Sequence, residues 1–133
     1  MNNNRPKILL GRFALDGHDK GIITVIDACK NAGMEIVYIH FSNPEEVVKS
    51  AIEEDVDVIG ITSSLGQHML VSSVLMQELS HNKVNIPVIM GGVIPTIDVP
   101  KLMDIGIKKV FGPGSTPKEA VSFISQIAQK EEP

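Results

Sequence analysis

The chain has 133 residues, of which 43% are hydrophobic and 21% charged, and a formal net charge of −4. This length suits a single domain over 1–133 with its core at about 5–128, and the acidic balance, without a stripe of Lys or Arg, argues against a nucleic acid partner. Its apolar runs are shorter than the roughly 20 residues that cross a bilayer, and its first residues lack a signal-peptide core, so we expect a cytoplasmic protein with no membrane partner.

Short apolar segments alternate five times with amphipathic segments along the chain. The apolar segments consist mostly of β-branched residues or Leu, which is typical of central strands in a parallel sheet. The amphipathic segments have the spacing of helices. In chain order, the sequence predicts a strand at 7–11, a helix at 21–32, a strand at 35–40, a helix at 44–53, a strand at 56–62, a helix at about 68–81, a strand at 87–90, a helix at about 99–104, a strand at 109–111 and a helix at 117–129.

Single residues mark some of these boundaries. Gly33 fits a stop for the first helix. Ser42, with Glu45 three residues later and Pro44 in the first turn, indicates a capped start for the second helix. Cys29 is the only cysteine, so an internal disulfide is excluded. Because it falls on the apolar side of the first helix, we expect an inert, buried thiol.

Five successive strand–helix units predict an α/β fold, a flavodoxin-like (Rossmann-like) doubly wound sheet of five parallel strands in the order 2-1-3-4-5. Ligands of such sheets bind at the carboxyl ends of the strands, around the point where the connections leave strands one and three in opposite directions. The loops at these ends, 12–20, 63–67, 91–95 and 112–116, are rich in Gly, Ser and Thr. Their clustering at one edge predicts a binding site.

The first of these loops contains the pattern Asp16-x-His18-x-x-Gly21. A carboxylate two residues from a His can accept the proton of one ring nitrogen, which fixes the tautomer and makes the other nitrogen a stronger metal donor. Gly21 lets a bulky group approach the backbone. One His and one Asp cannot hold a bare ion, so the pattern predicts a metal with further ligands from elsewhere. In the simpler interpretation, His18 is a surface loop residue and Asp16 a turn residue.

The same loops disfavour other uses of this fold. A phospho-receiver requires a phosphorylatable Asp at the end of strand three, where this chain has Ile61-Thr62-Ser63. A flavodoxin requires a Ser/Thr-rich phosphate loop after strand one, and a dinucleotide-binding fold requires Gly-x-Gly-x-x-Gly at that turn. The first loop has neither pattern.

Several other residues keep two interpretations. His40 at a strand end and His81 near a helix end are expected to be structural or solvated. His68 follows the 63–67 loop and could contact a ligand. Ser63 could line a site or cap the following helix, and Gly91-Gly92 could line a site or form a tight turn.

Together, Asp16-x-His18-x-x-Gly21, Ser63-x-Leu65 and Gly91-Gly92 resemble the cobalamin-binding domain in their order and in the loops that carry them. The resemblance extends over about 5–128. Within that superfamily the chain most resembles the C-terminal domain of methylmalonyl-CoA mutase and the separate small subunits of related acyl-CoA mutases. The segments that carry this closer resemblance are Asp55-Val56-Asp57-Val58-Ile59-Gly60, Gly91-Gly92-Val93-Ile94-Pro95 and Phe111-Gly112-Pro113-Gly114.

The resemblance implies an answer to the metal question. The corrin ring supplies four equatorial nitrogens, so His18 would be the axial ligand to cobalt. The cofactor's dimethylbenzimidazole would be displaced, and its nucleotide tail inserted between the sheet and the helices. The implied catalytic residues are His18, Asp16 and Arg12. The implied cofactor-binding residues are Asp16, Gly17, His18, Asp19, Gly21, Ser63, Leu65, Gly91, Gly92, Gly112, Gly114 and Ser115.

Two positions near the motif depart from the family pattern. Related mutases usually have Lys four residues before the motif Asp, where this chain has Arg12, and often Gly where it has Ala14. Arg12 can still pair with Asp16, bidentately and with a permanent charge. The resemblance therefore implies a relay of His18, Asp16 and a cation, in which the cation is an arginine.

The function implied by the resemblance is that of the cobalamin-binding small subunit of an adenosylcobalamin-dependent acyl-CoA mutase, which rearranges a carbon skeleton by a radical mechanism. A large TIM-barrel subunit would bind the acyl-CoA, in a heterotetramer of two large and two small chains. Two alternatives remain. A corrinoid carrier for methyl transfer is disfavoured because only residues 1–6 precede the first strand. A cobalamin-sensing module is disfavoured because the sequence shows no output domain.

Overall fold

A computed structural model describes residues 5–13, 20–63, 66–112 and 114–128. The strands are β1 (Lys7–Phe13), β2 (Glu35–Phe41), β3 (Val58–Ser63), β4 (Val88–Gly92) and β5 (Lys109–Phe111). The helices are α1 (Lys20–Asn31), α2 (Pro44–Glu54), α3 (His68–His81), α4 (Val99–Ile105) and α5 (Pro117–Ala128), with a 3-10 turn at Thr96–Asp98.

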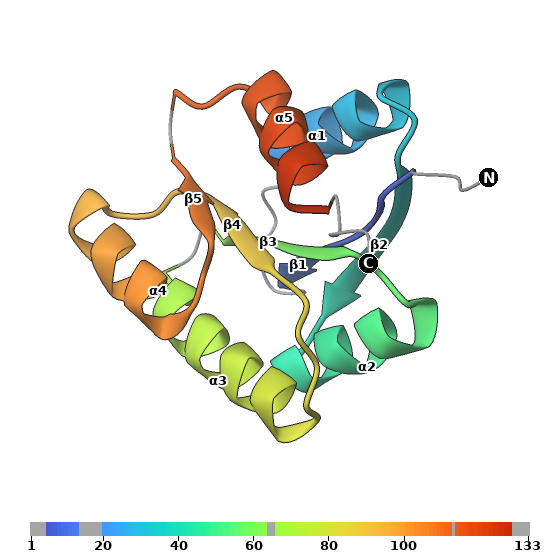
Figure 1. The fold of residues 1–133 in the computed structure, drawn as a ribbon. Coiled ribbons are helices and arrows are strands. Elements are labelled where there is room, and N and C mark those ends of the chain that lie inside the picture. Colours follow the sequence, from blue (N-terminus) through green and yellow to red (C-terminus); the bar gives the residue numbers. More distant parts are fainter. Residues whose placement is uncertain (1–4, 14–19, 64–65, 113, 129–133) are drawn as a thin grey trace.

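The strands form one parallel sheet in the order β2-β1-β3-β4-β5, which confirms the predicted flavodoxin-like topology. Figure 1 shows α1 and α5 on one face of the sheet and α2, α3 and α4 on the other. The central strands β1, β3 and β4 are largely buried, and their residues are mostly apolar. Among the described helices, none combines the length and the hydropathy needed to span a membrane.

The start of β3 differs from the prediction. The strand was expected from residue 56 and begins at Val58. Asp55 ends α2 in a left-handed conformation, with φ of 53°, and the Val56 N–H donates to the Ala51 carbonyl of that helix. Val56 is buried as a strand residue would be, but its backbone belongs to the end of the helix.

The end of β4 settles one of the open alternatives. Gly91 and Gly92 continue the strand and pair in register with Thr62 and Ser63 of β3. The interpretation of these glycines as a tight turn is therefore wrong. Both glycines keep the parallel ladder with β3, so they are the last two residues of the strand.

The start of α2 is capped one residue later than predicted. The cap is Asn43, whose side-chain oxygen accepts a hydrogen bond from the Glu46 N–H, while Glu46 Oε1 accepts one from the Ser42 N–H. Pro44 is the first helical residue, where its missing N–H costs no hydrogen bond, so the residue before it becomes the cap. The prediction of Ser42 with Glu45 was wrong by one position.

Two predictions for α1 are confirmed. Gly33 has φ of 88°, and its N–H donates to the Lys30 carbonyl as the helix ends. Cys29 is fully buried, and burial raises the pKa of its thiol to about 11. At neutral pH this thiol is protonated and unreactive.

Candidate functional site

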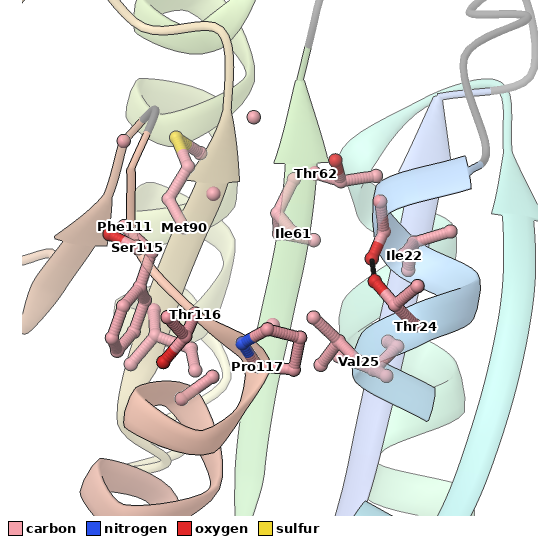
Figure 2. Close-up of a pocket in the computed structure, with 18 of the residues that line it drawn as sticks. Ile22, Thr24, Val25, Ile61, Thr62, Met90, Phe111, Ser115, Thr116 and Pro117 are labelled. Carbon is pink, nitrogen blue, oxygen red and sulfur yellow. Dashed lines mark hydrogen bonds between the residues drawn. The ribbon is translucent and has the colours of Figure 1, made fainter. Parts of the chain in front are cut away.

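On the face of the sheet that α1 and α5 cover, the side chains of β3 and β4 become smaller towards the carboxyl ends of the strands. Near their starts, Ile8, Val58 and Ile89 are large and buried on this face. Towards the carboxyl ends, Gly60 and Gly91 take the corresponding positions. A cavity of about 280 Å³ lies there, between the sheet and the first turns of α1 and α5 (Figure 2).

The wall of this cavity is mainly apolar, with hydroxyl groups among the aliphatic side chains. In Figure 2, α1 contributes Ile22 and Val25, and the start of α5 contributes Pro117. The complete wall consists of Leu10, Gly21, Ile22, Thr24, Val25, Gly60, Ile61, Thr62, Ile89, Met90, Gly91, Gly92, Phe111, Gly112, Gly114, Ser115, Thr116, Pro117 and Ala120.

Two of the hydroxyl groups fix the helix starts that frame the cavity. Thr24 Oγ1 donates to the Gly21 carbonyl at 2.7 Å in the first turn of α1. At the start of α5, the Thr116 N–H donates to Glu119 Oε1, and the Glu119 N–H donates to Thr116 Oγ1, each at 3.1 Å. This reciprocal capping box satisfies two backbone donors and sets where α5 begins.

Three glycines keep the cavity open although the backbone does not demand glycine there. A Cβ added at Gly21 or Gly112 would meet no heavy atom within 4 Å. A Cβ added at Gly91 would make only an ordinary contact, 3.5 Å from the Phe111 carbonyl oxygen. Neither a steric clash nor backbone strain therefore requires glycine at these three positions. The missing side chains leave space in the cavity.

Gly92 differs from its neighbour. Its φ is +117°, and a Cβ built there would overlap the Ser63 carbonyl oxygen of β3. That oxygen accepts a hydrogen bond from the Val93 N–H at 3.0 Å. Gly92 lines the cavity, but the close approach of two strands already requires a glycine at this position.

The structure brings together half of the predicted cofactor-binding set. Gly21, Gly91, Gly92, Gly112, Gly114 and Ser115 all line the cavity. Ser63 is buried at the end of β3, next to the cavity wall rather than in it. Asp16, Gly17, His18, Asp19 and Leu65 lie outside the described residues, so the axial ligand and its acidic partner stay predictions.

Several wall residues were not predicted. Thr24, Val25 and Ala120 face the cavity from helices, and Gly60 and Phe111 face it from strands. A glycine inside a strand signals a close approach of another group, so Gly60 carried a usable signal. The start of α5 was predicted at Pro117 and is confirmed, and the Thr followed three residues later by a Glu is a further sequence signal for it.

His68 lies away from the cavity. The residue is 4% exposed, and its Nε2 lies 2.7 Å from Asp98 Oδ2, just before α4. The hydrogen bond with His68 lowers the pKa of Asp98. In the described residues His68 therefore links the starts of α3 and α4, which is the structural interpretation of this residue.

Arg12 lies at the end of β1, 8% exposed, with its Nη2 3.1 Å from His40 Nε2 on β2. His40 thus has a structural role, as expected. The predicted pairing of Arg12 with Asp16 involves a residue outside the described part of the chain.

Comparison with known proteins places this geometry in a family context. The model of the B12 binding domain matches residues 6–122. The pivalyl-CoA mutase small subunit of Xanthobacter autotrophicus is 36% identical over 128 residues, which are 95% of this chain and 86% of that protein. The 2-hydroxyisobutanoyl-CoA mutase small subunit of Aquincola tertiaricarbonis is 33% identical over 130 residues, 96% of this chain and 95% of that protein.

The chain also matches part of a larger relative. The methylmalonyl-CoA mutase large subunit of Propionibacterium freudenreichii subsp. shermanii is 34% identical over 126 residues, which are 92% of this chain and 17% of that protein. The similarity therefore covers one segment of the longer enzyme.

Solved structures support the fold at lower identity. A cobalamin-binding protein from Desulfitobacterium hafniense superposes with a TM-score of 0.78 at 19% identity, over 92% of this chain and 59% of that one. A response regulator receiver domain from Francisella superposes with a TM-score of 0.70 at 16% identity, over 93% and 97% of the two chains. At these identities the superpositions establish the shared architecture alone.

Proposed function

Because this chain belongs to the B12-binding domain family, we propose that it is the cobalamin-binding small subunit of an acyl-CoA mutase. The observation that carries the proposal is the glycine-lined cavity at the carboxyl edge of the sheet, between β3, β4 and the starts of α1 and α5. The two relatives named as small subunits of such mutases, each matched over most of its length, support the same conclusion.

The residues around the cavity fit the nucleotide tail of cobalamin. The cavity volume of about 280 Å³ lies near the lower end of the range for ligand pockets, which begins at about 300 Å³. Gly91 and Gly112 keep side chains out of it, and its apolar wall can enclose a displaced aromatic base. Thr62 and Ser115 offer hydroxyl groups to the polar part of the tail.

For the lower face of the corrin we propose His18 as the axial ligand to cobalt and Asp16 as the acceptor of its second ring N–H. Gly17, Asp19 and Leu65 would add contacts from the same two loops. Bound as adenosylcobalamin, the cofactor supplies the radical chemistry. The chain holds the ring, orients it and tunes the axial bond through the carboxylate.

The acyl-CoA would bind to a large TIM-barrel subunit that covers the upper face of the corrin, in a complex of two large and two small chains. The support is the volume of the cavity, which the tail would fill, together with the need to exclude water from a reactive radical. The purified chain with adenosylcobalamin alone should show no turnover, and activity should require the large subunit. Turnover by the 133-residue chain alone would contradict this division of roles.

The axial ligand can be tested by electron paramagnetic resonance of the Co(II) form. Wild type should show superhyperfine splitting from one histidine nitrogen, and His18→Ala should lose it. His81→Ala, which removes a histidine at the far end of α3, is the matched control and should keep the splitting. If wild type and His18→Ala give the same pattern, the ligand assignment is wrong.

A further inference from the structure

Arg12 contacts a polar side chain that the proposed cofactor chemistry does not use. It lies on β1 directly opposite His40 of β2 in the parallel register. Only 8% of Arg12 is exposed, and its Nη2 lies 3.1 Å from His40 Nε2. A buried guanidinium therefore meets an imidazole at the carboxyl end of β1, directly before the loop that contains Asp16 and His18.

The chemistry of this contact fixes the state of the histidine. A guanidinium has five N–H donors and no acceptor, and it stays protonated in proteins. His40 Nε2 must therefore accept, which requires a neutral ring with its proton on Nδ1. The Tyr38 hydroxyl lies 3.2 Å from the same nitrogen. Because that nitrogen carries no proton, Tyr38 can only donate to it.

Tyr38 also fixes the plane of the imidazole. Residues two apart on a strand face the same side, and the Tyr38 and His40 rings meet edge to face, with centroids 5.1 Å apart at 81°. β2 is one of the two edge strands of the sheet. The two rings thus form a platform on β2, and the single Nε2 lone pair of His40 accepts from both the Tyr38 hydroxyl and the buried Arg12.

We propose that His40 is a positioning residue for Arg12, the arginine on β1 that directly precedes the loop with Asp16 and His18. Its Nε2 lone pair fixes one arm of the planar guanidinium fork at the end of β1, directly before the loop that contains Asp16 and His18. A lysine at position 12 presents a single point charge in place of this fork, so the platform suits arginine. The consequence for the cofactor rests on the proposed function, whereas the His40–Arg12 contact does not.

The first test uses the chain without cofactor. Two-bond ¹H–¹⁵N correlation spectra of the labelled protein at pH 7.5 should show His40 with a protonated Nδ1 and an unprotonated Nε2. Arg12→Met should shift the ring towards the Nε2–H tautomer, whereas the His81 signals should not move. A protonated Nε2 in the wild-type protein would overturn the proposal.

The second test measures cobalamin affinity in a double-mutant cycle. His40→Phe should weaken binding about 10-fold, the low end of what outer-shell partners of a metal ligand contribute. His40→Gln, which places an acceptor oxygen near the position of Nε2, should stay within about twofold of wild type. In an Arg12→Met background, His40→Phe should change the affinity less than about twofold.

The outcomes separate the two proposals. Equal effects of His40→Phe with and without Arg12, or a loss in His40→Gln as large as in His40→Phe, would overturn the positioning role. Failure of the wild-type chain to bind cobalamin would overturn the proposed function, and the tautomer experiment would still decide the His40–Arg12 contact.

Discussion

The two faces of the sheet are built from alternate residues of the same strands, yet the cavity of about 280 Å³ in the described part of the chain lies on one of them. On the packed face, which α2, α3 and α4 cover, Ile61 and Met90 belong to the hydrophobic core towards the carboxyl ends of β3 and β4, although both also border the cavity. On the open face, which α1 and α5 cover, the neighbouring residues Gly60 and Gly91 have no side chain. Because strand side chains alternate between faces, a site can be opened on one side without thinning the core on the other.

The packed face should carry most of the stability. Leu75 of α3 is fully buried on it, whereas Leu70 of the same helix is 67% exposed. Leu75→Ala should lower the free energy of unfolding by about 2–5 kcal/mol, the usual range for a buried Leu. Leu70→Ala, the matched control, should change it by less than about 0.5 kcal/mol. Urea denaturation checks both, and equal losses would show that the packed face is not the main core.

The two adjacent glycines of β4 should behave differently. Gly92→Ala places a Cβ against the Ser63 backbone at a φ of +117°, so it should lower the unfolding free energy by about 2–4 kcal/mol. Gly91→Ala adds a methyl group with ordinary contacts and should change it by less than about 1 kcal/mol. Thermal or urea unfolding of the pair would separate the backbone role of Gly92 from its place in the cavity wall. Similar losses in both variants would contradict this separation.

Away from the cavity, the face under α1 and α5 is packed with apolar side chains, and Cys29 is fully buried among them. Burial raises the pKa of this thiol to about 11, above the value of about 8.5 for a free thiol. The protonated thiol therefore adds stability that is complete below the unfolded pKa and is lost as the pH rises towards the folded one. Between pH 8 and pH 10.5, wild type should lose about 2 kcal/mol more unfolding free energy than Cys29→Ala.

Cys29→Ala also removes packing and so changes the unfolding free energy at every pH. The two proteins are therefore compared by how steeply the unfolding free energy falls with pH. Urea unfolding at several pH values gives both slopes, and the other titrating groups contribute equally to each. Parallel pH profiles for the two proteins would show that the thiol is accessible to water in the folded state.

The sequence was sufficient to predict the fold because its signals are local. Runs of β-branched residues and helical spacing predicted every strand and helix, and the topology followed from their alternation. The errors lie at the ends of elements, where an adjacent residue or element determines the backbone conformation. Val56 is buried but belongs to the turn after α2, and Pro44 moves the helix cap from Ser42 to Asn43.

The candidate site was predictable only in part. Loop glycines such as Gly91 and Gly112 were recognised because small residues gather at one edge of the sheet. Thr24 and Ala120 were missed, because their approach to the cavity depends on how α1 and α5 lie on the sheet. The contact of Arg12 with His40 was missed for a similar reason, since it depends on the register of two strands far apart in the sequence.

The central claim is that the open face holds the nucleotide tail, and matched Ala→Leu substitutions test it most directly. Ala120 of α5 lines the cavity, whereas Ala51 of α2 is fully buried on the packed face. Ala51→Leu overpacks the core and should lower the unfolding free energy by about 1–3 kcal/mol, with unchanged cobalamin affinity of the folded protein.

Ala120→Leu should place its side chain in the cavity at little cost in stability. Its affinity for cobalamin, measured by absorbance titration, should fall by about one to two decades, as an overpacked contact of about 1–3 kcal/mol implies. Affinity for cobinamide, which lacks the nucleotide tail, should stay within about threefold of wild type. Equal losses for the two ligands, or unchanged binding of cobalamin, would contradict the placement of the tail between the sheet and α1 and α5.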